Sequence, residues 1–83
     1  MDKNKEWKWS ILDPHMKGDK EVIAHDWVAN EASAKQQGYT KMHTIKYQNN
    51  RYFLNCMIQD FNMIPPRTWY YKIEPNCDTL IKV

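Results

Sequence analysis

The sequence predicts a small two-layer α+β domain in which one main helix packs on an antiparallel sheet, in the order β-α-β-β-β. Two observations lead to this prediction. The chain has 83 residues, 42% of them apolar, which suffices for one compact core but not for two domains. Most apolar residues lie in segments that alternate apolar and polar positions, as half-buried strands do, and only one segment has helical spacing. We therefore expect a single domain over residues 1–83, with fraying at residues 1–5.

The first strand is predicted over Glu6–Leu12, EWKWSIL. Its two tryptophans and its isoleucine point to one side of an extended chain, whereas Lys8 and Ser10 point to the other. Pro14 ends the strand, because proline has no N–H for a strand ladder and restricts the residue before it. This strand should lie half-buried at one face of the core.

The main helix is predicted near residues 20–37. Asp19 is the predicted N-cap, and Gly38 follows the last turn, where a left-handed residue often ends a helix. Apolar residues recur at helical spacing on one face, which includes Trp27 and is interrupted by Glu31. On this interpretation Trp27 belongs to the core.

An alternative for the same segment remains open. In it, Val22–Ala29 forms a strand, and Asn30 caps a short helix over Glu31–Gln37. The strand would place Asp26 on the same side as apolar neighbours, and this mixed face makes the long helix the preferred interpretation.

A β-hairpin is predicted next. Lys41–Gln48 and Arg51–Asp60 both alternate, and they flank Asn49 and Asn50, a pair that tolerates the positive φ of a tight turn. The pattern therefore predicts two antiparallel strands that turn at these two asparagines.

The last full strand is predicted over Arg67–Glu74. Its alternation places Trp69 toward the core and Tyr70 toward solvent. The tail, Leu80–Val83, is expected to be either a short edge strand or a frayed end.

The residues available for chemistry do not form a catalytic or metal-binding motif. Cys56 and Cys77 are the only cysteines, and we expect both to be free thiols, with Cys56 buried. In the predicted hairpin His43 would face Cys56, but no third group or oxyanion hole accompanies the pair. With only Gly18 and Gly38, the chain has no glycine-rich phosphate loop. The sequence therefore predicts a protein that is not an enzyme and that needs neither a cofactor nor a metal.

Binding is the better prospect, although the net charge is only +2. No acidic residue occurs over residues 32–59, so this basic window is where an anionic partner would dock most easily. Cations there alternate with aromatic rings, as they do in single-strand nucleic-acid platforms, while exposed apolar residues would suit a protein. The predicted partner-binding residues are Lys41, Lys46, Asn49, Asn50, Arg51 and Phe53.

This organisation, one small domain without a catalytic constellation, resembles that of many small proteins of bacteriophages and mobile elements. The resemblance implies a binding or inhibitory protein that blocks a host complex by surface contact, for instance a nucleic-acid-handling or defence complex. The alternative is direct RNA or DNA binding through the basic, aromatic-rich hairpin. We expect a cytoplasmic location, because the sequence has no signal-peptide pattern and no apolar run long enough to span a membrane.

Overall fold

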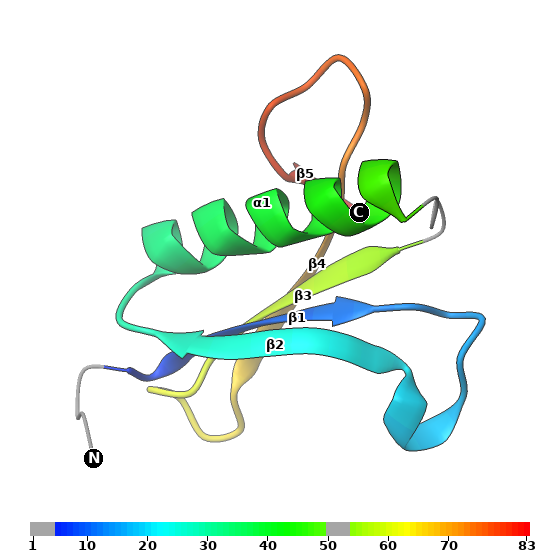
Figure 1. Cartoon of the computed structure of the whole chain (residues 1–83). Coiled ribbons are helices and arrows are strands. Elements are labelled where there is room, and N and C mark those ends of the chain that lie inside the picture. The colour runs from blue at the N-terminus through cyan, green and yellow to red at the C-terminus, as the bar shows by residue number, and fades with distance from the viewer. Residues whose placement is uncertain (1–4, 50–53) are drawn as a thin grey trace.

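The computed structural model describes residues 5–49 and 54–83 and confirms the α+β class. Within this part of the chain, one α-helix packs on one side of a five-stranded antiparallel sheet (Figure 1). The order is β-β-α-β-β-β, one strand more than predicted. In chain order the elements are β1 (Trp7–Leu12), a 3-10 turn (Gly18–Lys20), β2 (Val22–Val28), α1 (Glu31–Gln48), β3 (Asn55–Asp60), β4 (Arg67–Lys72) and β5 (Ile81–Lys82).

Strand β1 occupies the second position of the sheet, whose spatial order is β2-β1-β3-β4-β5. Trp9 illustrates the register, because it lies between Asp26 of β2 and Ile58 of β3. Both Trp9 and Ile11 are buried, as the alternation of the first strand predicts. The sheet therefore ends in two edges of very different length, the seven residues of β2 and the two residues of β5.

The helix predicted over residues 20–37 is wrong, and the alternative interpretation of this segment is correct. Val22–Val28 pairs with β1 as a strand, with a register irregularity opposite Ile11 and Leu12. A continuous helix would have carried Glu31 within its apolar face, whereas the strand buries Val28 and leaves Glu31 exposed at the start of α1.

The start of α1 shows an ordinary helix cap. The side-chain oxygen of Asn30 accepts a hydrogen bond from the backbone N–H of Ser33 (2.8 Å), so Asn30, and not Asp19, is the N-cap. One turn further on, Lys35 pairs with Glu31 at 2.9 Å, in the (i, i+4) arrangement that supports an exposed helix surface. The helix therefore begins as the alternative interpretation predicts but continues well beyond Gln37.

The hairpin predicted at Asn49 and Asn50 is also wrong. Residues 41–48 continue α1, and Asn49 is its C-cap, with its backbone N–H bonded to the Ile45 carbonyl (3.0 Å). Asn50 lies outside the described residues. The segment is compatible with both periods, and the sheet selects the helical one because Met42 and Ile45 then face the core together.

The strands predicted after residue 50 form, although with shorter bounds. In β3, Cys56 and Ile58 are buried, and in β4 Tyr71 is buried while Tyr70 remains 48% exposed. Trp69 is partly buried against the core. The C-terminal tail pairs with β4 as β5. Of the two alternatives predicted for the tail, the short edge strand is therefore confirmed.

The core lies between α1 and the strands β1 and β3. The buried helix positions Ala34, Gly38, Met42 and Ile45 recur every three or four residues on a single face. At Gly38 the helix approaches the sheet so closely that a Cβ atom would lie only 2.8 Å from the Cys56 Sγ. Gly38 is thus a packing residue in the middle of the helix, not the terminator that the sequence predicts.

This close approach makes Gly38→Ala a destabilising substitution. Overpacking of a well-packed core costs about 1–3 kcal/mol, which exceeds the gain of up to about 1 kcal/mol from replacing glycine inside a helix. We expect urea unfolding to show a net loss of stability. The Gly38→Ala/Cys56→Ala double variant should lose less than the two single variants combined, because the second change removes the sulfur that the new methyl group meets. Additive losses would contradict this explanation.

Candidate functional site

The side of the sheet opposite α1 is not covered by any α-helix of the described chain, and we call it the open face (Figure 1). Its side chains follow from the register, because residues directly opposite each other on neighbouring strands point to the same side. One row across the open face consists of cross-strand neighbours from four strands: His25, Ser10, Met57 and Tyr70. The next row begins with Trp27 and Lys8. Trp27 therefore belongs to this face and not to the core.

Several large apolar side chains remain exposed on this side of the molecule. Trp27 is 39% exposed, and its indole contacts the ring of Phe61, with 4.8 Å between the ring centroids. Phe61 begins the loop between β3 and β4, which extends beyond the sheet on the side away from α1 (Figure 1). In that loop Ile64 is 99% exposed. We call the following set the open-face patch: Trp27, Phe61, Met63, Ile64 and Tyr70.

The loop that carries Ile64 is anchored at its start. Asp60 is buried at the end of β3, and its Oδ1 atom accepts hydrogen bonds from the backbone N–H and the side-chain amide of Asn62, at 2.9 and 2.8 Å. The backbone N–H of Phe61 also donates to the Glu6 carbonyl at 2.8 Å. These bonds attach the loop to β1 and β3, so its exposed apolar tip is presented from an ordered base.

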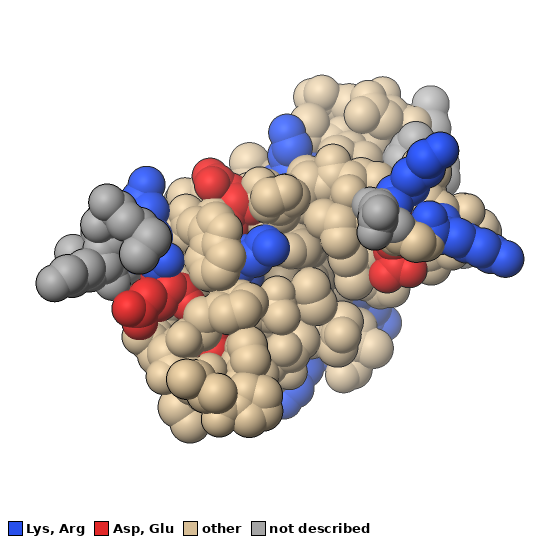
Figure 2. Space-filling model, turned by 90° about the horizontal axis from the view of Figure 1, so that it is seen from below, with Lys and Arg blue, Asp and Glu red and all other residues tan. Residues whose placement is uncertain are grey.

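Charge is sparse on the open face. Lys8 lies over the Trp27 ring, with its Nζ atom 5.2 Å from the ring centroid, and Lys72 pairs with Glu74 at 3.1 Å. No outward-pointing position of the five described strands carries Asp or Glu. Figure 2 shows this face, on which uncharged residues cover most of the surface and charged groups gather mainly toward its two ends. The surface is therefore aromatic and nearly neutral, with a slight excess of cations.

The predicted basic hairpin surface does not form. Lys41 and Lys46 both lie on α1, five residues apart, so they point in directions that differ by about 140°. Lys46 donates from Nζ to the Ile73 carbonyl at 3.4 Å, beside the C-terminal part of the sheet. Asn49 ends the helix. The other predicted site residues, Asn50, Arg51 and Phe53, lie outside the described residues.

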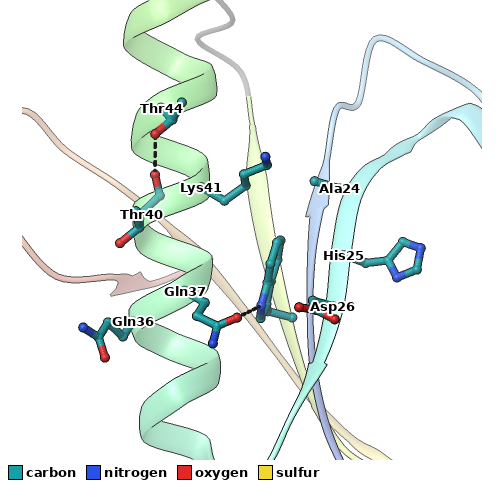
Figure 3. Close-up of a pocket in the computed structure, with 9 residues that line it drawn as sticks. Ala24, His25, Asp26, Gln36, Gln37, Thr40, Lys41 and Thr44 are labelled. Atoms are coloured by element: carbon teal, nitrogen blue, oxygen red, sulfur yellow. Dashed lines mark hydrogen bonds between the residues drawn. The ribbon is translucent and has the colours of Figure 1, made fainter.

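Lys41 instead lines a groove between α1 and β2, with a volume of about 780 Å³ (Figure 3). At its floor the Trp9 indole N–H donates to Gln37 Oε1 at 3.1 Å. Figure 3 shows Lys41 extending from the helix toward Ala24, with Asp26 further along the same strand. Most of the residues that line the groove carry polar side chains, although apolar atoms make up the larger share of its surface.

The predicted apposition of His43 and Cys56 is wrong. His43 is exposed on α1 between the rings of Tyr39 and Tyr47, whereas Cys56 is fully buried in β3. Both Cys56 and Cys77 are free thiols, as predicted. The described residues contain no group of three or more His, Cys, Asp or Glu side chains arranged to hold a metal ion. No described helix has the length and apolar character needed to cross a membrane.

Of the open-face patch, the sequence places only Tyr70 toward solvent. The helical interpretation of residues 20–37 assigns Trp27 to the core, although the neighbouring polar residues His25 and Asp26 are a signal against it. Ile64 precedes Pro65 and Pro66, a strong loop signal, and an apolar residue in such a loop is a recognisable candidate for surface contact.

Burial should make the Cys56 thiol unreactive. Removal from water raises its pKa from 9.0 to about 12, because the thiolate cannot be hydrated there. At about pH 8 a thiol reagent should therefore label Cys77 in the native protein and Cys56 only after unfolding.

The same shift predicts a loss of stability in alkali. Above about pH 9 the unfolded chain loses the Cys56 proton while the folded chain keeps it, so the free energy of unfolding falls by up to about 1.4 kcal/mol per pH unit. We expect urea titrations at successive pH values to show that the free energy of unfolding falls more steeply with pH in the wild type than in Cys56→Ala. Equal slopes in the two proteins would show that Cys56 does not contribute.

Comparisons with known proteins add no functional assignment. No protein-family model, curated protein or solved structure matches this chain. The inference about function therefore depends on the two surfaces described above, the open face with its patch and the groove beside β2. Of these, the open face carries the larger exposed apolar side chains.

Proposed function

We propose that this protein is a non-enzymatic binding protein that attaches to another protein through the open-face patch. The observation that supports this most directly is the exposure of large apolar side chains on one side of the molecule, with Ile64 at 99%, Tyr70 at 48% and Trp27 at 39%. Exposed apolar surface of this kind is characteristic of protein contact sites, and tryptophan and tyrosine are enriched among residues that dominate binding energy.

The chemistry of the patch favours a protein over a nucleic acid as the partner. Nucleic-acid binding depends largely on cations that contact phosphates. On the open face, Lys8 lies against Trp27 and Lys72 is paired with Glu74, so few cations are available there. Aliphatic side chains such as that of Ile64 gain little from contact with phosphate groups but gain much from burial against apolar protein surface.

The arrangement of the patch suits a contact with a central anchor and a polar rim. Tyr70 offers a ring and a hydroxyl from a sheet position, where the backbone pairs with β3 on one side and accepts a hydrogen bond from the Val83 N–H on the other. Ile64 extends from the loop beyond the sheet and is able to enter a pocket on a partner. The uncharged residues between them exclude water from the contact without requiring costly desolvation of ions.

The expectation that the partner belongs to a host complex that handles nucleic acid or acts in defence stays a prediction. The alternative of direct nucleic-acid binding through a basic hairpin is withdrawn in that form, because Lys41 and Lys46 belong to α1. Nucleic-acid binding through another surface is one of the outcomes that the following experiment can detect.

The partner should be identified by photo-crosslinking from position 64, because this fully exposed site accepts a photoreactive side chain without loss of packing. The crosslinked protein is then purified and its affinity for the wild type measured by calorimetry. We expect Tyr70→Ala to weaken binding by about 2 kcal/mol, or about 30-fold. Ile64→Ser should also weaken binding, while both variants keep the wild-type unfolding temperature.

Tyr47→Ala is the matched control, because Tyr47 is also a tyrosine, 39% exposed, but lies on α1. It should bind as the wild type does. A crosslinked species destroyed by nuclease, or an affinity that falls steeply with salt, would identify a nucleic acid as the ligand and overturn the proposal. Equal losses in Tyr70→Ala and Tyr47→Ala would also contradict it.

A further inference from the structure

Strand β2 is the one long edge of the described sheet, and part of its backbone points away from the sheet. The N–H of Trp27 is bonded to the side chain of Asp26 (2.8 Å) instead of to a carbonyl of β1, so it faces outward. Backbone groups alternate in direction along an antiparallel strand, which places the N–H and the carbonyl of His25 on the same outer edge. Asp26 and Ala24 then direct their backbone groups toward β1.

A second β2 can run antiparallel to the first about His25. In that register Ala24 lies opposite Asp26 on both sides of His25, and both positions face the α1 side of the sheet. The regular pairing ends there, because the register irregularity of β2 falls at Ile23 and places Ile23 and Trp27 on opposite sides of the sheet. A shift of the register by two residues in one direction would instead place the Asp26 carboxylates of the two copies directly opposite each other, which like-charge repulsion disfavours.

The groove supplies a charge match for the same register. Ala24, Asp26 and Lys41 all line it, and Lys41 extends from α1 toward Ala24 (Figure 3). Among residues 5–49 and 54–83, neither Lys41 nor Asp26 has an ion-pair partner. Ala24 and Asp26 would form a non-hydrogen-bonded pair, with Cα atoms about 4.5 Å apart. The Asp26 carboxylate of the second copy therefore enters the groove beside Lys41.

We propose that the occupant of the β2 edge is a second copy of this chain, paired antiparallel about His25, with Lys41 of each copy bound to Asp26 of the other. The two-fold axis runs perpendicular to the sheet, so the two sheets join at β2 and both helices lie on the same side. The two open faces then become one continuous surface. This inference does not rest on the proposed function, because the contact uses the backbone edge of β2 and Lys41, and of the open-face patch only Trp27 lies on β2.

Local structure permits the pairing. Helix α1 lies mainly over β1 and β3, so the groove leaves space for side chains of an added strand. The outer edge of β2 contains no proline and no lysine, two residues with which proteins protect sheet edges, and its bulge at Ile23 limits the regular part of the edge to residues 24–28. The opposite edge, β5, has two residues and offers no comparable template.

Sedimentation velocity of the full chain between about 1 µM and about 1 mM should detect a dimer. Lys41→Glu and Asp26→Lys should each raise the dimer dissociation constant by about tenfold or more, since each leaves two like charges facing across the contact. The double variant Lys41→Glu/Asp26→Lys restores both ion pairs with reversed sign, so its dimer dissociation constant should be close to that of the wild type. Lys35→Glu is the control, because Lys35 pairs with Glu31 on the same helix outside this groove.

Amide exchange tests the backbone part of the contact. The His25 amide should become protected only at concentrations at which the dimer forms, whereas the Asp26 amide, bonded toward β1, should be protected at all concentrations. A protein that remains monomeric at about 1 mM overturns the proposal. So does a dimer in which the double variant fails to restore association, or one that Tyr70→Ala disrupts while His25 remains unprotected. The last result would place the dimer contact on the open face.

Discussion

The close approach of α1 to the sheet at Gly38 is the constraint on which the rest of the structure depends. A single methyl group at this position would meet the Cys56 sulfur at 2.8 Å, so the helix can lie this near only because residue 38 has no side chain. The contact sets the helix over the centre of the sheet, where Trp9, Ile11 and Ile58 fill the remaining space. Because the chain is short, this one interface provides most of its buried core.

This placement of the helix has consequences for both surfaces of interest. A single helix is narrower than a five-stranded sheet, so a helix seated over β1 and β3 leaves β2 largely uncovered and creates the groove between α1 and β2. It also leaves the opposite side of the sheet without an α-helix over it. The open face and the groove therefore result from the same packing arrangement, although they differ in chemistry: the first is aromatic and nearly neutral, and the second is lined mainly by polar residues, among them Asp26 and Lys41.

The two edges of the sheet also behave differently. Strand β5 is short, and it ends one side of the sheet with little exposed backbone. Strand β2 is long and apolar at both ends, and its one acidic side chain satisfies the backbone N–H of Trp27. This bond and the bulge at Ile23 protect the edge in the single chain, whereas the regular part of the strand stays available to a second strand.

The sequence alone was sufficient for the fold class, the first strand and the alternation of β4. It placed Trp9, Ile11 and Cys56 in the core and Tyr70 toward solvent, because strict alternation with well-placed prolines is compatible with only one type of element. It could not decide the secondary structure of residues 20–48, because apolar residues there recur at both helical and strand spacing. It named Lys41 as a partner-binding residue on a strand, whereas Lys41 lies on α1 beside the groove, and it did not indicate the open-face patch as a site.

Only the tertiary structure resolved this ambiguity. A strand over Val22–Val28 is stabilised by the ladder it forms with β1, whose paired residues lie ten or more positions away in sequence and whose contribution no local pattern expresses. Once β2 is a strand, Asn30 becomes the helix cap, Gly38 moves to the middle of α1, and Trp27 turns to the open face. Local periodicity thus determined which residues could be buried, whereas long-range strand pairing decided which of the two compatible structures formed.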